Sequence, residues 1–277
     1  MYRKTTKNKM AKTIFITGTS SGLGKASAFL FAKQGWNVIA TMRNPDAEKE
    51  LNQVSNIKLL KLDVTDAAQI EEVIGNLLKT TKVDAVFNNA GYGLAGPFEG
   101  ASEEQIQQQI NTNVLGVMRV TRAFLPHFRA NKSGLFITTT SIGGHVAFPL
   151  FSLYHATKWA LEGWSESLSH ELSQYGITVK TIAPGGITTD FAGRSLVLAR
   201  HPAYEKMVEK ALVTFSDPKR RKGYSTPEQI AEVVYEAVTD GKNQLRYIAG
   251  KDAKSMYRIR HLFGYKFFMK QVRKTFF

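Results

Sequence analysis

A tyrosine and a lysine four positions apart are the residues of this chain best suited to chemistry. Tyr154 and Lys158 fall early in the stretch 151–174, whose apolar spacing predicts a helix. Positions i and i+4 share one face of a helix, so the ammonium is expected near the phenol. A free tyrosine titrates at about 10, and a neighbouring cation is expected to lower that pKa toward the range useful for proton exchange. The pair therefore predicts an acid–base group.

A second pair with the same spacing shows that the pattern alone is not decisive. Tyr247 and Lys251 begin in a predicted strand, where residues four apart lie about 13 Å from each other. Thirteen residues before Tyr154 the chain has a hydroxyl, that of Ser141, whereas thirteen residues before Tyr247 it has Val234. Ser141 ends a predicted strand that feeds the next helix, so it is expected at the same edge of the sheet as Tyr154. Context therefore favours Tyr154.

A glycine-rich turn lies between the first predicted strand and the first predicted helix. Small residues let a backbone approach a pyrophosphate, and a helix N-terminus offers free N–H groups and a positive dipole end. The spacing is G-x-x-x-G-x-G. Taken by itself, the loop could also be an ordinary Gly/Ser turn between a strand and a helix. The residues expected to contact a dinucleotide here are Gly18, Ser20, Ser21, Gly22, Leu23 and Gly24.

The end of the second predicted strand bears on the choice of nicotinamide. NAD-binding folds usually place a carboxylate there for the ribose 2′-OH. This chain has none at Thr41 or Met42, and Arg43 offers a guanidinium suited to a 2′-phosphate. The sequence therefore favours NADP(H), with NAD(H) as the alternative. Asp63, after the third strand, could bind the adenine amino group or simply form a turn.

These residues need a scaffold, and the chain alternates strand and helix patterns. Strands are expected at 13–17, 37–42, 57–62, 85–87, 135–139, 178–183 and 244–249. Helices are expected at about 25–34, 66–78, 103–131, 151–174 and 227–239. Such alternation predicts right-handed βαβ units. The expected fold is α/β, a Rossmann-type doubly wound parallel sheet in a single domain, with ligands beyond the carboxyl ends of the strands.

Over about residues 12–250 the chain resembles the short-chain dehydrogenase/reductases. The matching motifs are Thr17 to Gly24, Asp63-Val64, Asn88-Asn89-Ala90-Gly91, Asn113, Ser141, Tyr154 with Lys158, and Pro184-Gly185 followed by Thr188. Seven motifs in the family's order make a chance match improbable.

The resemblance implies a role for each motif. Tyr154 would exchange the proton, Lys158 would lower its pKa and hold the nicotinamide ribose, and Ser141 would bond the substrate oxygen. Asn113 would hold a water linked to Lys158, Thr188 would fix the carboxamide, and Asn88 would support the cofactor. The remaining implied cofactor contacts are Val64, Asn89, Ala90, Gly91, Pro184, Gly185 and Ile187. Many NADP-preferring relatives carry a Lys or Arg in the Gly-rich loop, where this chain has Ser20 and Ser21.

Composition excludes several other classes of site. The chain has 277 residues and no cysteine, which excludes disulfides, Cys-ligated zinc and iron–sulfur clusters. Its six histidines are scattered and no H-E-x-x-H pair exists, so we expect no metal. The start lacks the apolar region of a signal peptide and no apolar run spans a membrane, so a cytoplasmic location is expected.

The net charge of +14 attracts anions of any kind. Much of the excess sits at the two ends of the chain, which are usually solvated or form oligomers. We therefore expect a homo-oligomer, a dimer or tetramer, and no nucleic-acid partner.

The substrate is expected to be a carbonyl or alcohol of apolar character, such as a steroid-, retinoid- or acyl-type compound. The wall between Ser141 and Tyr154 is apolar, and the segment 188–225 is a candidate lid. The alternative is that its residues form amphipathic helices packed on the core. The apolar residues concerned are Val146, Ala147, Phe148, Leu150 and Phe151 in the wall, and Phe191, Leu196, Val197, Leu198, Met207, Leu212 and Phe215 in the lid; His145 is read as a pocket lining or surface residue.

Outside the catalytic domain, 12–250, the chain is expected to have a basic tail at 1–11 and an accessory helix at 251–277. In that helix Met256, Ile259, Leu262, Phe263 and Phe267 fall roughly on one stripe. Packing on protein is favoured, because a helix needs only one apolar stripe to dock. Contact with an anionic membrane stays as the alternative.

Together these residues predict an NADP(H)-dependent oxidoreductase acting on a C=O or CH–OH group. The alternative is a non-catalytic NADP-binding sensor or scaffold on the same fold. A sensor need not keep the four groups Tyr154, Lys158, Ser141 and Asn113 together, so the enzyme is favoured.

Overall fold

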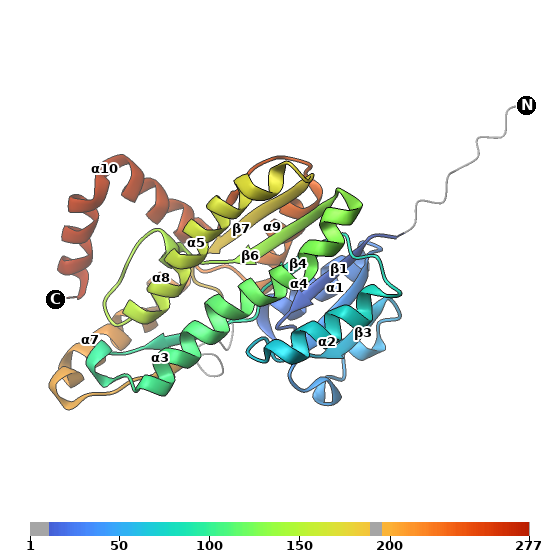
Figure 1. Ribbon diagram of the computed structural model, residues 1–277. Coiled ribbons are helices and arrows are strands. Elements are labelled where there is room, and N and C mark those ends of the chain that lie inside the picture. The colour runs from blue at the N-terminus through green and yellow to red at the C-terminus, as the bar shows by residue number, and fades with distance from the viewer. Residues whose placement is uncertain (1–10, 189–195, 277) are drawn as a thin grey trace, which may run out of the picture.

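A parallel sheet of seven strands forms the centre of the molecule (Figure 1). The structure is a computed structural model that describes residues 11–188 and 196–276. The strand order is β3-β2-β1-β4-β6-β7-β9. The strands are β1 (Thr13–Thr17), β2 (Asn37–Met42), β3 (Ile57–Lys61), β4 (Ala85–Asn88), β6 (Gly134–Thr139), β7 (Ile177–Pro184) and β9 (Arg246–Ala249). The expected doubly wound parallel sheet is confirmed.

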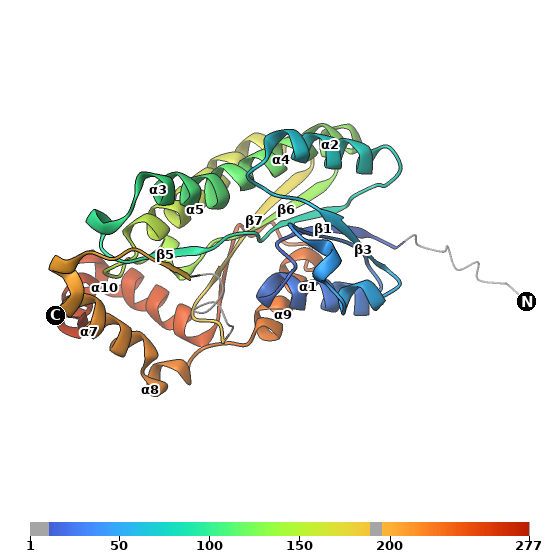
Figure 2. The same ribbon diagram turned by 90° about the horizontal axis from the view of Figure 1, so that it is seen from below.

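Helices cover both faces of the sheet, which explains why its central strands are continuous apolar runs. Ile14, Phe15 and Ile16 of β1 are fully buried. Figure 2 shows α1 (Gly22–Lys33) and α9 (Pro227–Thr239) on one face. The other face carries α2 (Ala67–Leu78), α4 (Gly116–Asn131) and α5 (Ser152–Ser173). Two apolar clusters, one on each face, form the core.

The chain reverses its direction of winding between β1 and β4. From β1 it runs outward through β2 to β3, and then returns to the other side of β1 as β4. Ligands of such sheets bind beyond the carboxyl ends of the strands at this switch point. The glycine-rich loop after β1 and the Asn88–Gly91 turn after β4 both lie there.

The long helix expected over 103–131 is interrupted. It consists of α3 (Glu103–Ile110), a π-helical segment at Asn111–Leu115, and α4. A π turn inserts one residue into the helix without disturbing the apolar pattern on either side, so the sequence did not show it. Asn113 lies inside this segment.

The candidate lid contains a short strand that the sequence did not predict, and helices of the kind that the sequence left open as the alternative. β8 (Leu196–Leu198) pairs in parallel with β5 (Gly93–Ala95), and α7 (Glu205–Ser216) and α8 (Pro218–Arg221) follow. Strands of three residues are too short to show an alternating pattern. Phe191 and its neighbours at 189–195 lie outside the described residues.

The helix expected at the C-terminus is α10 (Lys251–Phe276), and it is bent. Gly264 has φ 73° and ψ 179°, which breaks the helical register. The predicted stripe is wrong from Leu262 onward: Met256 and Ile259 are partly buried, whereas Leu262 and Phe263 just before the bend and Phe267 after it are exposed. Phe268 and Phe276 are buried instead, in a third apolar cluster with Val146, Ala211 and their neighbours.

The remaining expectations concern membranes and the N-terminal tail. In the ranges 11–188 and 196–276, no helix combines the length and apolar character that crossing a bilayer requires. Residues 1–10 of the basic tail lie outside the described residues.

Candidate active site

Ser141, Tyr154 and Lys158 lie together at the carboxyl edge of the sheet. Ser141 begins the turn after β6, and Tyr154 and Lys158 project from the first two turns of α5. The Ser141 hydroxyl is hydrogen-bonded to Tyr154, and its Oγ accepts the Gly143 N–H at 3.0 Å. The Nζ of Lys158 lies 5.7 Å from the centre of the Tyr154 ring. The predicted grouping of these three side chains is therefore present.

The electrostatics of the pair differ from the expectation. Burial raises the pKa of Tyr154, and the hydrogen bond with Ser141 only partly opposes that rise. The prediction of a lowered tyrosine pKa is thus wrong for this structure, because it counted the neighbouring cation and omitted the cost of ionising a buried phenol. Burial also lowers the pKa of Lys158, to about 8, and the negative charge of Glu162 acts against this.

The ammonium group of Lys158 is fixed by one hydrogen bond and has further N–H donors. Its Nζ donates to the carbonyl oxygen of Thr139 at 2.8 Å. Within the described residues this carbonyl is its one hydrogen-bond partner, although an ammonium has three donors. The Nζ therefore keeps N–H groups for a ligand.

Asn113 ties the Asn88–Gly91 turn to α5. Its Oδ1 accepts the Tyr92 N–H at 3.0 Å, and its Nδ2 donates to the Tyr92 carbonyl at 2.8 Å and to Thr157 Oγ1 at 3.3 Å. The side chain is 1% exposed and lies next to Gly91. These bonds place Asn113 beside Lys158; the water expected to link the two residues stays a prediction.

His155 is a positioning residue that the sequence reasoning missed. Its ring is buried; Nδ1 contacts the Gly143 carbonyl at 2.8 Å and Nε2 accepts the Phe148 N–H at 3.1 Å. Burial lowers the pKa of His155, so the neutral ring is favoured. Following Tyr154 directly on α5, it fixes the Ser141 turn against the helix. Its position directly after Tyr154 was the signal from which the sequence could have predicted this role.

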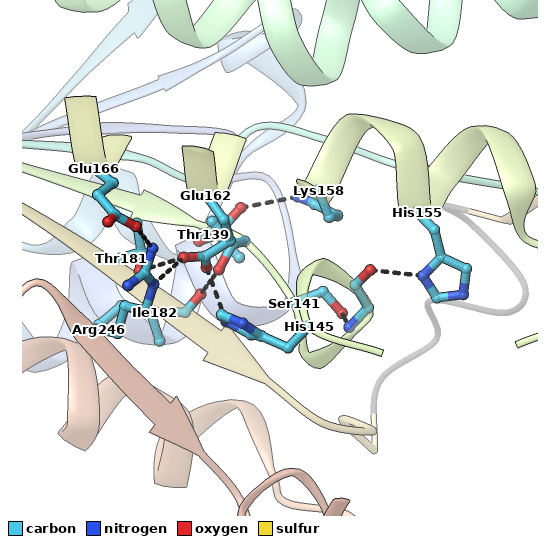
Figure 3. A network of polar contacts seen from close by, with 12 residues as sticks. Thr139, Ser141, His145, His155, Lys158, Glu162, Glu166, Thr181, Ile182 and Arg246 are labelled. Atoms are coloured by element: carbon cyan, nitrogen blue, oxygen red, sulfur yellow. Dashed lines mark hydrogen bonds and ion pairs between the residues drawn. The ribbon is translucent and has the colours of Figure 1, made fainter. Parts of the chain in front are cut away.

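A buried carboxylate lies one helical turn beyond Lys158 (Figure 3). Glu162 accepts from Arg246 Nε at 2.9 Å and from Thr181 Oγ1 at 3.3 Å, and its Oε1 lies 3.3 Å from His145 Nε2. Burial raises the pKa of Glu162, but its contacts with His145, Thr140 and Arg246 outweigh this and hold the pKa below its ordinary value.

His145 is thus a partner of this carboxylate, and not only a surface or pocket-lining residue. The spacing of Glu162 from Lys158 was the available signal for the network.

The glycine-rich loop packs tightly against the turn after β4. Gly18 has φ +71°, and a Cβ there would lie 2.7 Å from the Cα of Ala90, so no larger residue fits. Asn89 Nδ2 donates to the carbonyls of Thr17 and Gly18, and Ala90 N donates to Thr17 Oγ1 at 3.0 Å. The loop is therefore held in place by the chain's own residues.

The N-terminus of α1 has features that suit an anionic ligand. Its N-cap, Ser21, makes no side-chain capping bond, and the first turn holds no acidic residue. By contrast, α2, α3 and α9 are capped by Asp66, Ser102 and Thr226. The first N–H groups of α1 are therefore available to a pyrophosphate. Ser20 is exposed, Ser21 and Gly22 are partly buried, and Leu23 and Gly24 are buried.

The expected adenosine contacts have different surroundings. Arg43 directly follows β2 and is exposed, and in the described part of the chain no carboxylate pairs with it. Asp63 Oδ1 accepts from Thr65 N at 2.9 Å and Thr65 Oγ1 at 2.8 Å, which is the turn role kept open for it. Val64 is buried against Gly116 of α4.

The segment after β7 is anchored to α10 and to the end of the lid. Gly185 N donates to Ala249 O at 3.0 Å, and Gly186 N donates to Asp252 Oδ2 at 2.7 Å. Pro184 pairs with Ala249, Ile187 bridges Ser225, and Thr188 N donates to Ser225 O at 2.8 Å. Asp252 was another residue that the sequence reasoning missed, and it links α10 to the predicted cofactor segment.

An aromatic wall borders the Tyr154 side of the site. The Phe151 ring lies 6.2 Å from Tyr154 and 5.4 Å from Phe215 of α7, centre to centre. Phe215 in turn lies 5.1 Å from Phe276 of α10. Leu150, just before the wall, has φ 67°, a left-handed conformation that a leucine rarely adopts. The lid and the C-terminal helix therefore meet at the edge of the site.

Comparisons with known proteins agree on one family. Residues 12–196 match the family model described as short chain dehydrogenase. An uncharacterized oxidoreductase of Schizosaccharomyces pombe is 36% identical over 210 residues, covering 76% of this chain and 88% of the relative. A 3-ketodihydrosphingosine reductase of Bacteroides thetaiotaomicron is 36% identical over 179 residues, covering 64% of this chain and 65% of the relative.

Solved structures show the same likeness. A short-chain dehydrogenase from Streptomyces avermitilis has a TM-score of 0.84 and 32% identity, covering 96% of this chain and 97% of its own. ElxO with NADP bound has a TM-score of 0.72 and 27% identity, covering 86% of this chain and 98% of its own.

Proposed function

Because the chain belongs to the short-chain dehydrogenase family, we propose that it is an enzyme that transfers hydride between NADP(H) and a carbonyl or alcohol carbon. One observation carries the proposal: Tyr154, hydrogen-bonded to Ser141, lies beside a lysine with unused donors at the carboxyl edge of the sheet. A non-catalytic sensor would have no need of this grouping.

The residues divide the work of the reduction as follows. The reduced nicotinamide supplies the hydride that reaches the carbonyl carbon. Tyr154 donates its phenolic proton to the carbonyl oxygen, and its raised pKa keeps that proton in place at neutral pH. The Ser141 hydroxyl can turn from Tyr154 to donate to the same oxygen, while the Gly143 N–H keeps its Oγ in place. Lys158 stabilises the negative charge left on Tyr154 and binds a ribose hydroxyl with its remaining donors.

We propose NADP(H) as the preferred cofactor. No acid ends β2, and Arg43 is exposed and unpaired among the described residues. The likeness to ElxO, whose structure has NADP bound, supports this choice. The uncapped N-terminus of α1 would hold the pyrophosphate, and Arg43 the 2′-phosphate.

Reversing the charge of Arg43 tests this preference. Arg43→Asp is expected to weaken NADPH affinity roughly ten- to hundredfold, because one charged hydrogen bond is worth ~1.5–3 kcal/mol, and to improve NADH use. Lys61→Asp is the matched control, because Lys61 is the exposed base that ends the neighbouring strand β3. Affinities are measured by titration of cofactor fluorescence. Equal effects of the two substitutions would refute the role of Arg43.

We propose an apolar substrate of moderate or larger size. The aromatic wall of Phe151, Phe215 and Phe276 borders the acid–base pair. The relative named 3-ketodihydrosphingosine reductase supports a ketone attached to a long apolar chain. Steroid- and retinoid-type carbonyls have the same character.

A panel of carbonyl compounds tests the reaction and the substrate class together. NADPH oxidation is followed by absorbance with apolar ketones and aldehydes and with small sugars. Turnover with at least one apolar carbonyl is expected. Better turnover with sugars would refute the apolar site, and tight NADPH binding without any turnover would favour the sensor.

We further propose a homo-oligomer in the cytoplasm. Leu115, the last residue of the π segment, is 38% exposed, and Trp159 of α5 is 47% exposed; both offer apolar surface to a second copy. Trp159→Glu is expected to reduce the mass seen by light scattering. An unchanged mass would place the interface elsewhere.

A further inference from the structure

The bend of α10 exposes a compact group of large apolar side chains. We call residues 260–267 the apex. Leu262 is 77% exposed, Phe263 and Tyr265 are each 60% exposed, and Phe267 is 40% exposed. Figure 1 shows the two legs of α10 meeting at the end of the molecule away from α2 and β3. Single exposed apolar residues are ordinary, but four within six positions mark a contact surface.

The apex is held by packed legs. Ala253 before the bend, and Phe268, Val272 and Phe276 after it, are buried in the third apolar cluster. Within the apex, Phe263 and Phe267 contact each other with ring centres 5.0 Å apart, and the Arg260 guanidinium lies 5.2 Å from the centre of the Tyr265 ring. These contacts and the packed legs hold the apex on a folded helix, and we call its exposed apolar side chains the ridge.

The charge around this ridge has one sign. After Asp252 the sequence contains no acidic residue. The cations in the same stretch are Lys254, Arg258, Arg260, Lys266, Lys270, Arg273 and Lys274. Half of the net charge of +14 is thus concentrated on one bent helix. A partner must accept apolar side chains and supply negative charge.

We propose that the apex docks on an anionic lipid surface. Acyl chains accept Leu262 and Phe263, Tyr265 suits the headgroup boundary, and anionic headgroups attract the flanking cations. A second copy fits poorly, because a two-fold interface would bring the same cations face to face. A nucleic acid would satisfy the cations but leave the aliphatic Leu262 without an apolar environment.

The position of the apex gives the docking a use. The leg after the bend contacts the wall of the site, because Phe276 lies against Phe215, and Phe215 lies against Phe151. A lipid surface at the apex would be joined to the border of the site by one helical leg, which runs from the bend at Gly264 to Phe276. This consequence rests on the proposed function and its apolar substrate, whereas the docking itself does not.

A single labelled cysteine tests the docking directly. The chain has no cysteine, so Leu262→Cys accepts an environment-sensitive dye at one position. Val213→Cys on α7 is the control, because Val213 is also highly exposed, at 72%. The full chain is mixed with vesicles of phosphatidylglycerol and phosphatidylcholine, or of phosphatidylcholine alone. A blue-shifted, severalfold brighter emission is expected only for position 262, only with anionic vesicles, and less at high salt.

Flotation of unlabelled protein with the same vesicles separates the contributions. The double variants Leu262→Ser/Phe263→Ser and Lys266→Glu/Lys270→Glu are each expected to bind at least about tenfold less, while Val213→Ser binds normally. All of them should keep their circular dichroism and NADPH binding. No flotation of the wild type refutes the proposal, as does a dye response at position 262 that follows protein concentration without lipid. If all variants bound RNA and vesicles equally, binding would depend on the net charge of the protein and not on the apex, and the proposal would also be refuted. Loss of activity with intact flotation would count against the proposed function alone.

Discussion

The chain contains two close tyrosine–lysine pairs, and their surroundings differ. In the first, Lys158 Nζ lies 5.7 Å from the Tyr154 ring centre; in the second, Lys180 Nζ lies 5.2 Å from the Tyr247 ring centre. Lys180 donates to the Ala237 carbonyl at 2.7 Å, to Asp240 at 2.8 Å and to the Tyr247 hydroxyl at 3.2 Å. All three of its donors are used, whereas the described structure gives Lys158 one partner.

The difference separates a structural pair from a reactive one. The Tyr247 hydroxyl donates its proton in a 2.5 Å hydrogen bond to Asp240 Oδ2. Burial and, to a smaller extent, this bond raise the pKa of Tyr247. Asp240 also neutralises Lys180. Tyr154 has a hydroxyl partner, Ser141, that can turn to a substrate. Because the two pairs share the same side-chain chemistry, unused hydrogen-bonding capacity is what distinguishes the pair that we propose to be reactive.

Removing each lysine should give opposite results. Lys158→Met is expected to lower turnover by about 10²-fold or more, within the range of acid–base contributions, and to leave stability intact or improved. Lys180→Met is expected to keep turnover per folded molecule and lose about 3–5 kcal/mol of unfolding free energy, because Asp240 loses its buried partner. Steady-state kinetics and urea unfolding measure both.

The stability side of this prediction follows from the pKa of Lys158. Burial lowers it from 10.5 to about 8, so the charge opposes folding at neutral pH, and the penalty disappears as pH rises from 8 to 10.5. The pKa shift corresponds to a cost of roughly 3 kcal/mol in unfolding free energy, from which about 1 kcal/mol is subtracted because Lys158→Met also loses the hydrogen bond to Thr139. A Lys180→Met protein that is stable and inactive would reverse our assignment of the two pairs.

The structural pair should also dominate the response to acid. Despite burial, the bonds from Lys180 and Tyr247 lower the pKa of Asp240 from 3.8 to about 2. This stabilisation is present above the unfolded pKa and is lost as pH falls from about 4 through 2, an effect of ~2 kcal/mol. Asp240→Asn should flatten that part of the stability curve, measured by urea unfolding between pH 2 and 6, with Asp46→Asn as the exposed control. An unchanged slope would mean that Asp240 is not coupled to folding.

The smallest expected effect concerns Glu162, whose charge opposes the lowering of the Lys158 pKa. Carbonyl reduction should decline above pH 8, as Lys158 loses its proton. Glu162→Gln removes the opposing charge, so the decline should move to lower pH, by roughly one unit or less. Glu166→Gln, one turn further and exposed, is the control. A merely structural Glu162 would change stability without moving the pH profile, and a shift to higher pH would contradict the sign.

Local patterns were sufficient to predict the sheet and the grouping of Ser141, Tyr154 and Lys158 at its edge. β1, β2 and α9 begin and end where the apolar runs do, because buried parallel strands leave a continuous signal. The spacing of Tyr154 and Lys158 was informative because it could be checked against Ser141. Tyr247 was correctly placed in a strand, away from any action with Lys251.

What the sequence did not show depends on contacts between distant segments. Lys180 meets Asp240 only once β7 and the end of α9 are packed together. The π segment around Asn113 and the bend at Gly264 shift the register of helices whose composition looks uniform. The raised pKa of Tyr154 follows from burial that no local pattern encodes.

The central claim is that Tyr154, and not Tyr247, is the acid–base group, and removal of each hydroxyl tests it most directly. Tyr154→Phe and Tyr247→Phe are compared in one NADPH-oxidation assay, with NADPH binding and urea unfolding measured on the same samples. Tyr154→Phe should lose at least about 10²-fold in turnover while still binding NADPH and folding normally. Tyr247→Phe should retain turnover and lose stability. Substantial activity in Tyr154→Phe, or its selective loss in Tyr247→Phe, would contradict the account.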